Sequence, residues 1–167
     1  MNRRFTLTLG AMGLLASGGA LYTSKVAAQT KTLKESIIGT WEITSVYDQY
    51  EDGKKNSPFG AGVTGRYVFG SDGSFTHSII GEPQAEMKSN DPRRPDSLIV
   101  IFLGRYTVDE AKKTISYKIE HAGYSARNGS EQSLSVTFNG DTASFAGSSR
   151  KDQIGTFSPH FEVKRFK

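Results

Sequence analysis

The sequence predicts an all-β fold, an eight-stranded antiparallel up-and-down β-barrel. Three observations carry this prediction. Hydrophobic and polar residues alternate over short runs, turn residues separate the runs, and Gly39-Thr40-Trp41 opens the first run as at the closing corner of a small barrel. Alternation with a period of two indicates half-buried strands. Eight antiparallel strands can close into a barrel that holds side chains or one small ligand, and closure removes the exposed edges.

The first residues, 1–28, have the features of an export signal that is cleaved after Ala28. Arg3 and Arg4 precede an apolar run, and Val26-Ala27-Ala28 provides the small residues that a signal peptidase accepts. Thr, Ser and Gly interrupt the run, which argues against a retained membrane anchor. The arginine pair fits a twin-arginine signal incompletely, so general secretion and the folded-export route both stay open. We therefore expect a periplasmic or secreted bacterial protein without membrane contact after cleavage.

Charge and cysteine content narrow the class of function. Three of the 21 basic residues lie in the signal, which leaves 18 Lys and Arg against 17 Asp and Glu in the mature chain. These charges are interspersed, whereas nucleic-acid-binding proteins gather Lys and Arg on one face, so no nucleic-acid partner is expected. The absence of Cys excludes disulfides and a lipoprotein anchor. The fold must therefore be stable through its core alone.

The barrel domain is expected over residues 37–167, after a polar lead-in at 29–36 that includes a helical turn. In the first strand, alternation places Trp41, Ile43, Ser45 and Tyr47 on one face. Ser71-Asp72-Gly73 predicts a tight hairpin, and Asn139-Gly140 predicts another. The eight predicted strands are 39–50, 65–69, 74–80, 102–108, 114–121, 132–138, 142–147 and 160–166.

Residues 81–96 break the alternation. They contain three prolines and several charges, which indicates a loop. The following segment, 98–102, is apolar throughout, so a short helix capped by Asp96 or Ser97 and a strand are both compatible with it. We expect this short helix or loop to lie across the mouth of the barrel.

The inward strand faces predict a wall that could line a ligand cavity or fill the barrel as a solid core. A buried Tyr needs a hydrogen-bond partner, so tyrosines facing one lumen could orient an apolar ligand, and His77 is the candidate histidine for the same role. The three histidines lack metal-ligand spacing and no nucleophile motif occurs, so no metal, cofactor or catalytic residue is expected. The predicted ligand-binding residues are Tyr47, Tyr67, Phe69, Phe75, His77, Tyr106, Tyr117, Leu134 and Val136.

The chain resembles the bacterial lipocalin-like domain family over about residues 37–167. The resemblance rests on the order and spacing of short motifs: Gly39-Thr40-Trp41, Pro58-Phe59-Gly60, Phe69-Gly70-Ser71-Asp72-Gly73-Ser74-Phe75, Gly104-Arg105-Tyr106-Thr107-Val108-Asp109-Glu110 and Val163-Lys164-Arg165. It implies that a basic residue of the last strand packs over Trp41, beside Gly39, and closes the barrel floor. Arg165 is the candidate for this role and Lys164 the alternative. A guanidinium stacked on an indole contributes about 0.5–2 kcal/mol.

These features together predict a protein that binds a small hydrophobic molecule in the barrel lumen. Two alternatives stay open. One is an isomerase or cyclase in which a Tyr or His77 moves a proton on an apolar substrate. The other is a packed structural barrel without a ligand. The volume of the lumen and the hydrogen-bond partners of His77 distinguish the three.

Overall fold

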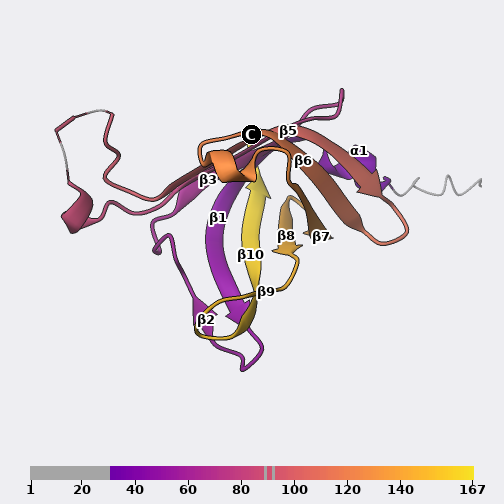
Figure 1. Cartoon of the computed structure of the whole chain (residues 1–167). Coiled ribbons are helices and arrows are strands. Elements are labelled where there is room, and N and C mark those ends of the chain that lie inside the picture. Colours follow the sequence, from indigo (N-terminus) through magenta and orange to yellow (C-terminus); the bar gives the residue numbers. More distant parts are fainter. Residues whose placement is uncertain (1–30, 89, 92) are drawn as a thin grey trace, which may run out of the picture. The chain divides into compact units, whose positions relative to one another are not determined.

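Eight antiparallel strands close into a barrel in the computed structural model of the chain (Figure 1). The structure describes residues 31–88, 90–91 and 93–167. The predicted export signal, residues 1–28, and its cleavage site lie outside the described residues. Among the described residues, no helix is both long and apolar enough to span a membrane.

The strands follow one another around the barrel in the order β1-β3-β4-β5-β6-β7-β8-β10, and β10 returns to β1. Two further strands of two residues each, β2 and β9, extend the edges of β1 and β10 at one end. The elements are α1 (Leu33–Ile37), β1 (Gly39–Tyr50), β2 (Lys55–Asn56), β3 (Thr64–Phe69), β4 (Ser74–Ile80), η1 (Ala85–Met87), β5 (Ile99–Asp109), β6 (Thr114–Ala122), η2 (Ser125–Arg127), β7 (Glu131–Asn139), β8 (Thr142–Gly147), β9 (Arg150–Lys151) and β10 (Thr156–Arg165). The predicted fold class and the eight predicted strands are confirmed.

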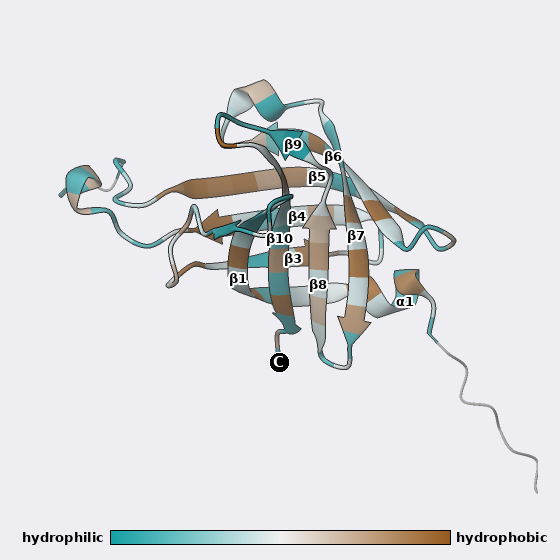
Figure 2. Cartoon of the chain, turned by 90° about the horizontal axis from the view of Figure 1, so that it is seen from below, coloured by the Kyte–Doolittle hydropathy of each residue, from teal (hydrophilic) through white to brown (hydrophobic). Residues whose placement is uncertain are grey.

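The apolar segment 98–102 is a strand and belongs to β5. Both faces of β5 are apolar here, since Val100 and Phe102 pack against the core cluster while Ile101 and Leu103 stay 41% and 43% exposed on the other face. The hydropathy colouring in Figure 2 shows this continuous apolar character. A strand that is apolar on both faces does not alternate, which is why its sequence also fitted a helix.

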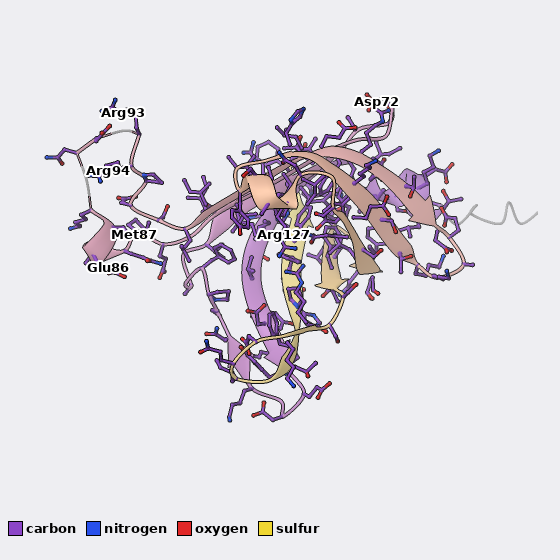
Figure 3. The ribbon with its side chains drawn as sticks, viewed as in Figure 1. Asp72, Glu86, Met87, Arg93, Arg94 and Arg127 are labelled. Atoms are coloured by element: carbon purple, nitrogen blue, oxygen red, sulfur yellow. The ribbon has the colours of Figure 1, made fainter. Side chains whose placement is uncertain are left out.

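The described residues between 81 and 98 extend away from the barrel, with Glu86, Met87, Arg93 and Arg94 at the far end (Figure 3). None of the described residues between 81 and 98 lines the interior cavity. The predicted loop 81–96 therefore contributes nothing to the cavity wall, whereas Ile99, Val100, Ile101 and Phe102 of the apolar segment line it as part of β5. The short helix near the open end is η2, which lies between β6 and β7.

A β-bulge in β1 reverses the predicted face of its second half. Pairing with β10 shifts register between Ile43 and Ser45, so one extra residue of β1 is inserted there. Beyond the bulge, Val46 is buried and Tyr47 turns to the outer face, where its ring stacks on His160 with centroids 5.1 Å apart. The predicted inward position of Tyr47 is wrong, because strict alternation does not continue through a bulge.

The closed end of the barrel is built around Trp41. Its indole is fully buried and donates from Nε1 to the carbonyl oxygen of Ile37 at 2.8 Å. The guanidinium of Arg165 lies over the indole ring, 4.4 Å from its centroid, and donates to the carbonyl oxygens of Ser36 and Ile38. Arg165 rather than Lys164 occupies this position. Gly39 beside it has φ +119°, and a Cβ there would lie 3.1 Å from Arg165 Nη1.

The helix α1 packs its two buried residues, Leu33 and Ile37, against this end of the core. Thr32 and Glu35 form a capping box at its first turn. The carboxylate of Glu110 accepts hydrogen bonds from the backbone N–H groups of Leu33 and Lys34, each at 2.8 Å. These contacts tie the lead-in to the loop between β5 and β6.

Candidate functional site

The barrel interior is filled at the closed end and hollow at the other. The filled half is an aromatic cluster of Tyr67, Phe69, Phe75 and Phe145, and Phe145 in turn packs against Trp41. The open half contains a cavity of about 370 Å³. This volume lies within the range of about 300–1,000 Å³ that is typical of small-molecule sites.

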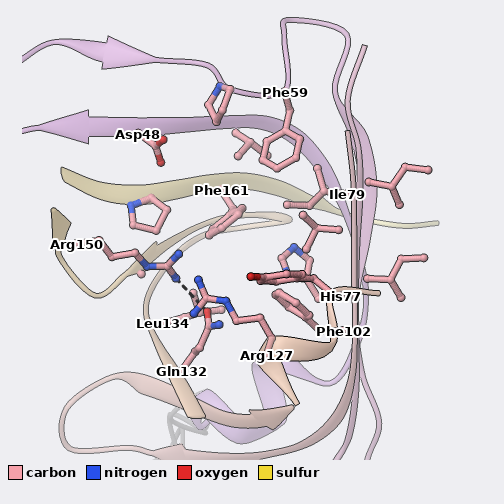
Figure 4. Close-up of a pocket in the computed structure, with 18 of the residues that line it drawn as sticks. Asp48, Phe59, His77, Ile79, Phe102, Arg127, Gln132, Leu134, Arg150 and Phe161 are labelled. Atoms are coloured by element: carbon pink, nitrogen blue, oxygen red, sulfur yellow. Dashed lines mark hydrogen bonds between the residues drawn. The ribbon is translucent and has the colours of Figure 1, made fainter. Parts of the chain in front are cut away.

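The cavity wall is mostly apolar and aromatic. Phe59, Phe102, Phe157 and Phe161 supply most of its rings, and Figure 4 shows Phe59, Phe102 and Phe161 arranged around the space with His77. The lining residues are Val46, Asp48, Pro58, Phe59, His77, Ile79, Ile99, Val100, Ile101, Phe102, Tyr117, Tyr124, Arg127, Gln132, Leu134, Gly147, Arg150, Phe157, Pro159 and Phe161.

The structure divides the nine predicted wall residues among three places. His77, Tyr117 and Leu134 line the cavity. Tyr47 lies on the outer face, where its hydroxyl donates to Glu162 at 3.2 Å. The remaining five belong to the buried core cluster and not to the lining: Tyr67, Phe69, Phe75, Tyr106 and Val136. Both sequence alternatives, an open lumen and a packed core, are therefore realised in different halves of one barrel.

His77 lies at the boundary between the two halves. It is 2% exposed, and its ring stacks on Tyr67 with centroids 4.0 Å apart. Neither of its ring nitrogens has a hydrogen-bond partner among the described residues, and the Tyr67 hydroxyl likewise has none. Burial lowers the pKa of His77 from 6.5 to about 3, because the protonated ring would lose its hydration. At neutral pH this side chain is an uncharged group with one donor and one acceptor.

A second polar group sits on β6 and β7. The Tyr117 hydroxyl donates to Gln132 Oε1 at 3.0 Å, and Arg150 Nη2 donates to the same oxygen at 3.1 Å. Burial raises the pKa of Tyr117 to about 12. The phenol therefore stays protonated and acts as the donor in this hydrogen bond.

Asp48 lies on the β1 wall of the cavity. The β1 bulge turns it inward, and burial raises the pKa of its carboxyl while the charge of Arg150 opposes that shift. No group of three or more His, Cys, Asp or Glu side chains within the described residues is placed to hold a metal ion.

Sequence reasoning missed several lining residues because of their local context. Asp48 follows the bulge, Phe59 lies in a loop, and Arg127 and Arg150 lie outside the eight long strands. Phe102 and Phe161 were placed in strands but not assigned to the wall. For Phe161 a signal existed, since it alternates with Pro159 and Val163 in the last strand.

Comparison with known proteins supports one family. The sequence model of the lipocalin-like domain family matches residues 38–157, from β1 into β10. An uncharacterized protein from Bacteroides eggerthii is 15% identical in sequence over 77% of this chain and 98% of its own, with a TM-score of 0.40. The siderocalin Ex-FABP, described as functioning through dual ligand specificities, is 11% identical over 77% of this chain and 73% of its own, with a TM-score of 0.29. No curated protein matches the sequence.

Proposed function

The chain belongs to the lipocalin-like domain family, and on this premise we propose that it binds one small, mainly apolar molecule in the open half of its barrel. The observation that carries the proposal is the cavity of about 370 Å³ with the unpartnered ring of His77 in its wall. A buried polar group without a partner costs free energy. A ligand hydroxyl or carbonyl that meets His77 would remove that cost.

The apolar wall of the cavity would supply most of the binding free energy, and His77 would orient the ligand. Apolar ligand surface that leaves water contributes about 25 cal/mol per Å² before the costs of association are subtracted. Phe59, Phe102 and Phe161 offer that surface, since their rings line the cavity. His77 contributes orientation, because a polar group in a mostly apolar part of the wall favours the placement in which it meets a polar group of the ligand.

Binding is better supported than proton transfer. A general base works best when its pKa is near the working pH, whereas the pKa of His77 is about 3. The ring of Tyr67 stacks on His77 at 4.0 Å instead of presenting a hydrogen-bonded hydroxyl to it. His77 is therefore suited to contact a ligand and poorly suited to abstract a proton from one.

The matched substitutions Val46→Phe and Val68→Phe test the proposal. Val46 lines the cavity and is 2% exposed, while Val68 on β3 is 37% exposed. Both changes add the same atoms, but only the first fills the lumen. We expect the neutral fluorophore N-phenyl-1-naphthylamine to bind the parent protein and Val68→Phe, and to bind Val46→Phe at least about tenfold more weakly.

Thermal melts of both variants show whether each is folded. Equal fluorophore binding by the two folded variants would contradict a lumenal site. Native mass spectrometry of the protein purified from its source cell then measures the mass of any molecule it retains.

Export of the protein belongs to the same proposal. A ligand carrier with a cleaved signal at residues 1–28 would act in the periplasm or outside the cell, which fits the charge and length of that segment. Fractionation of the source cell, with the mass of the mature chain measured in each fraction, tests the compartment and the cleavage after Ala28 together.

A further inference from the structure

One side of the cavity carries two positive charges that form no ion pair among the described residues. Arg127 comes from η2 and is half-buried, and Arg150 comes from β9 and is exposed at the rim. Figure 4 shows both guanidinium groups on the same side of the cavity, beside Gln132. Two segments that are distant in sequence therefore bring like charges to one place.

Neither guanidinium forms an ion pair within the part of the chain that the structure describes, although the charge of Arg150 acts on the carboxyl of Asp48. The ion pairs of the described residues involve other side chains, and the single side-chain hydrogen bond found for the pair runs from Arg150 to Gln132. Asp152, two residues from Arg150, accepts instead from the Tyr50 hydroxyl at 2.8 Å and from two backbone N–H groups. Like charges held close together repel each other, and an anion between them would remove the repulsion.

The direction of the Gln132 hydrogen bonds adds a third donor. Its Oε1 accepts from both Tyr117 and Arg150. Because a guanidinium can only donate, the atom facing Arg150 must be the oxygen, and the Nε2 amide of Gln132 remains as a donor. Arg127, Arg150 and Gln132 thus present donors, and Tyr117 directs its own hydroxyl at Gln132.

The number of positive and negative side chains in the cavity lining indicates which net charge on a ligand would be favoured. The lining contains the two arginines and one carboxylate, that of Asp48 on the β1 wall. A formal excess of one positive charge remains when Asp48 is ionised. A single negative charge on the ligand completes the balance.

We propose that the ligand is an amphipathic monoanion whose carboxylate lies against Arg127, Gln132 and Arg150 while its apolar part reaches toward His77 and Phe102. This inference rests on the proposed lumenal binding. A planar carboxylate matches the paired N–H donors of a guanidinium, and such charge-assisted hydrogen bonds are stronger than neutral ones. The apolar remainder of the cavity excludes ligands that carry charge along their whole length.

Competition with two probes of equal chain length tests the inference. Decanoate and decan-1-ol are each titrated against N-phenyl-1-naphthylamine bound to the mature protein. We expect decanoate to displace the fluorophore at least about tenfold more effectively than the alcohol. In the double variant Arg127→Met, Arg150→Met this preference disappears, while displacement by decan-1-ol is unchanged. Arg94→Met is the matched control, since Arg94 lies in the projecting loop, and it retains the preference.

The outcomes separate the two proposals. Equal displacement by acid and alcohol in the parent protein, or a preference that survives the double variant, overturns the anion site and leaves lumenal binding standing. A parent protein that is folded in a thermal melt but binds neither the fluorophore nor the probes overturns lumenal binding, and the anion site with it.

Discussion

Substitution of His77 by Leu is expected to remove a specific acid sensitivity of the fold. The ring is fully buried between Tyr67, Phe102 and Phe161 and has no hydrogen-bond partner among the described residues. Leu replaces it with an apolar group of similar size, so two buried nitrogens without a partner are removed. At neutral pH the variant is expected to be at least as stable as the parent protein.

The size of the stability loss at low pH follows from the difference between the pKa of His77 in the folded chain and its pKa in the unfolded chain. In the unfolded chain His77 takes up a proton below about pH 6.5, whereas in the folded chain it does so only near pH 3. Its folded pKa is lowered, so the stability it permits is complete above about pH 6.5 and declines as the pH falls toward 3. Two pH units below the unfolded value, at about pH 4.5, the loss is about 3 kcal/mol.

Urea unfolding between about pH 7.5 and 4.5, followed by the fluorescence of Trp41, measures this loss, because Trp41 is the one tryptophan in the sequence. We expect the free energy of unfolding of the parent protein to fall by about 3 kcal/mol more than that of His77→Leu over this interval. Val163→Ala is the matched control, since it weakens the core without removing a titratable group and should follow the pH dependence of the parent. Parallel curves for the parent and His77→Leu would show that the folded histidine is protonated normally, which would refute its isolation.

Two further predictions concern the closed end and the strand contacts. Trp41→Ala should lower the free energy of unfolding by about 3–5 kcal/mol, because a fully buried indole is lost; a melting temperature equal to that of the parent would contradict the floor assignment. Gly104→Ala should destabilise the barrel severely, because its Cβ would lie 1.9 Å from the Lys118 carbonyl oxygen, while Gly123→Ala, with its nearest contact at 4.0 Å, serves as the control in the same urea titration.

The strands could be predicted from sequence because their signals are local. Alternation over five to twelve residues and turn residues such as Ser71-Asp72-Gly73 depend only on neighbours in the chain, and the sequential hairpins place each strand beside the next. The pairing of β1 with β10 could be predicted for a related reason. Once eight sequential strands are counted, closure pairs the last with the first. The resemblance to the lipocalin-like family implied the basic residue over Trp41, and in the structure Arg165 pairs with Trp41.

The cavity could not be predicted to the same extent, because its residues depend on irregularities in the strands. The bulge between Ile43 and Ser45 exchanges the faces of Tyr47 and Asp48, and in the sequence only the adjacent polar residues Thr44 and Ser45 mark the change. Asp48 therefore reads as an outward polar residue although it faces the lumen. The proximity of Arg127 and Arg150 is harder to predict from the sequence, because both lie in connections between the long strands and the path of these connections depends on the closed barrel.

The division of the interior explains why one histidine matters for both stability and binding. Aromatic rings from β1, β3, β4 and β8 fill the closed end and support Tyr67, on which His77 stacks. His77 also contributes to the cavity wall, and both of its ring nitrogens are buried without partners among the described residues. An apolar residue at this position would make the barrel more stable but would offer a ligand no polar contact. The cost of burying His77 is therefore what we expect of a side chain that serves recognition rather than packing.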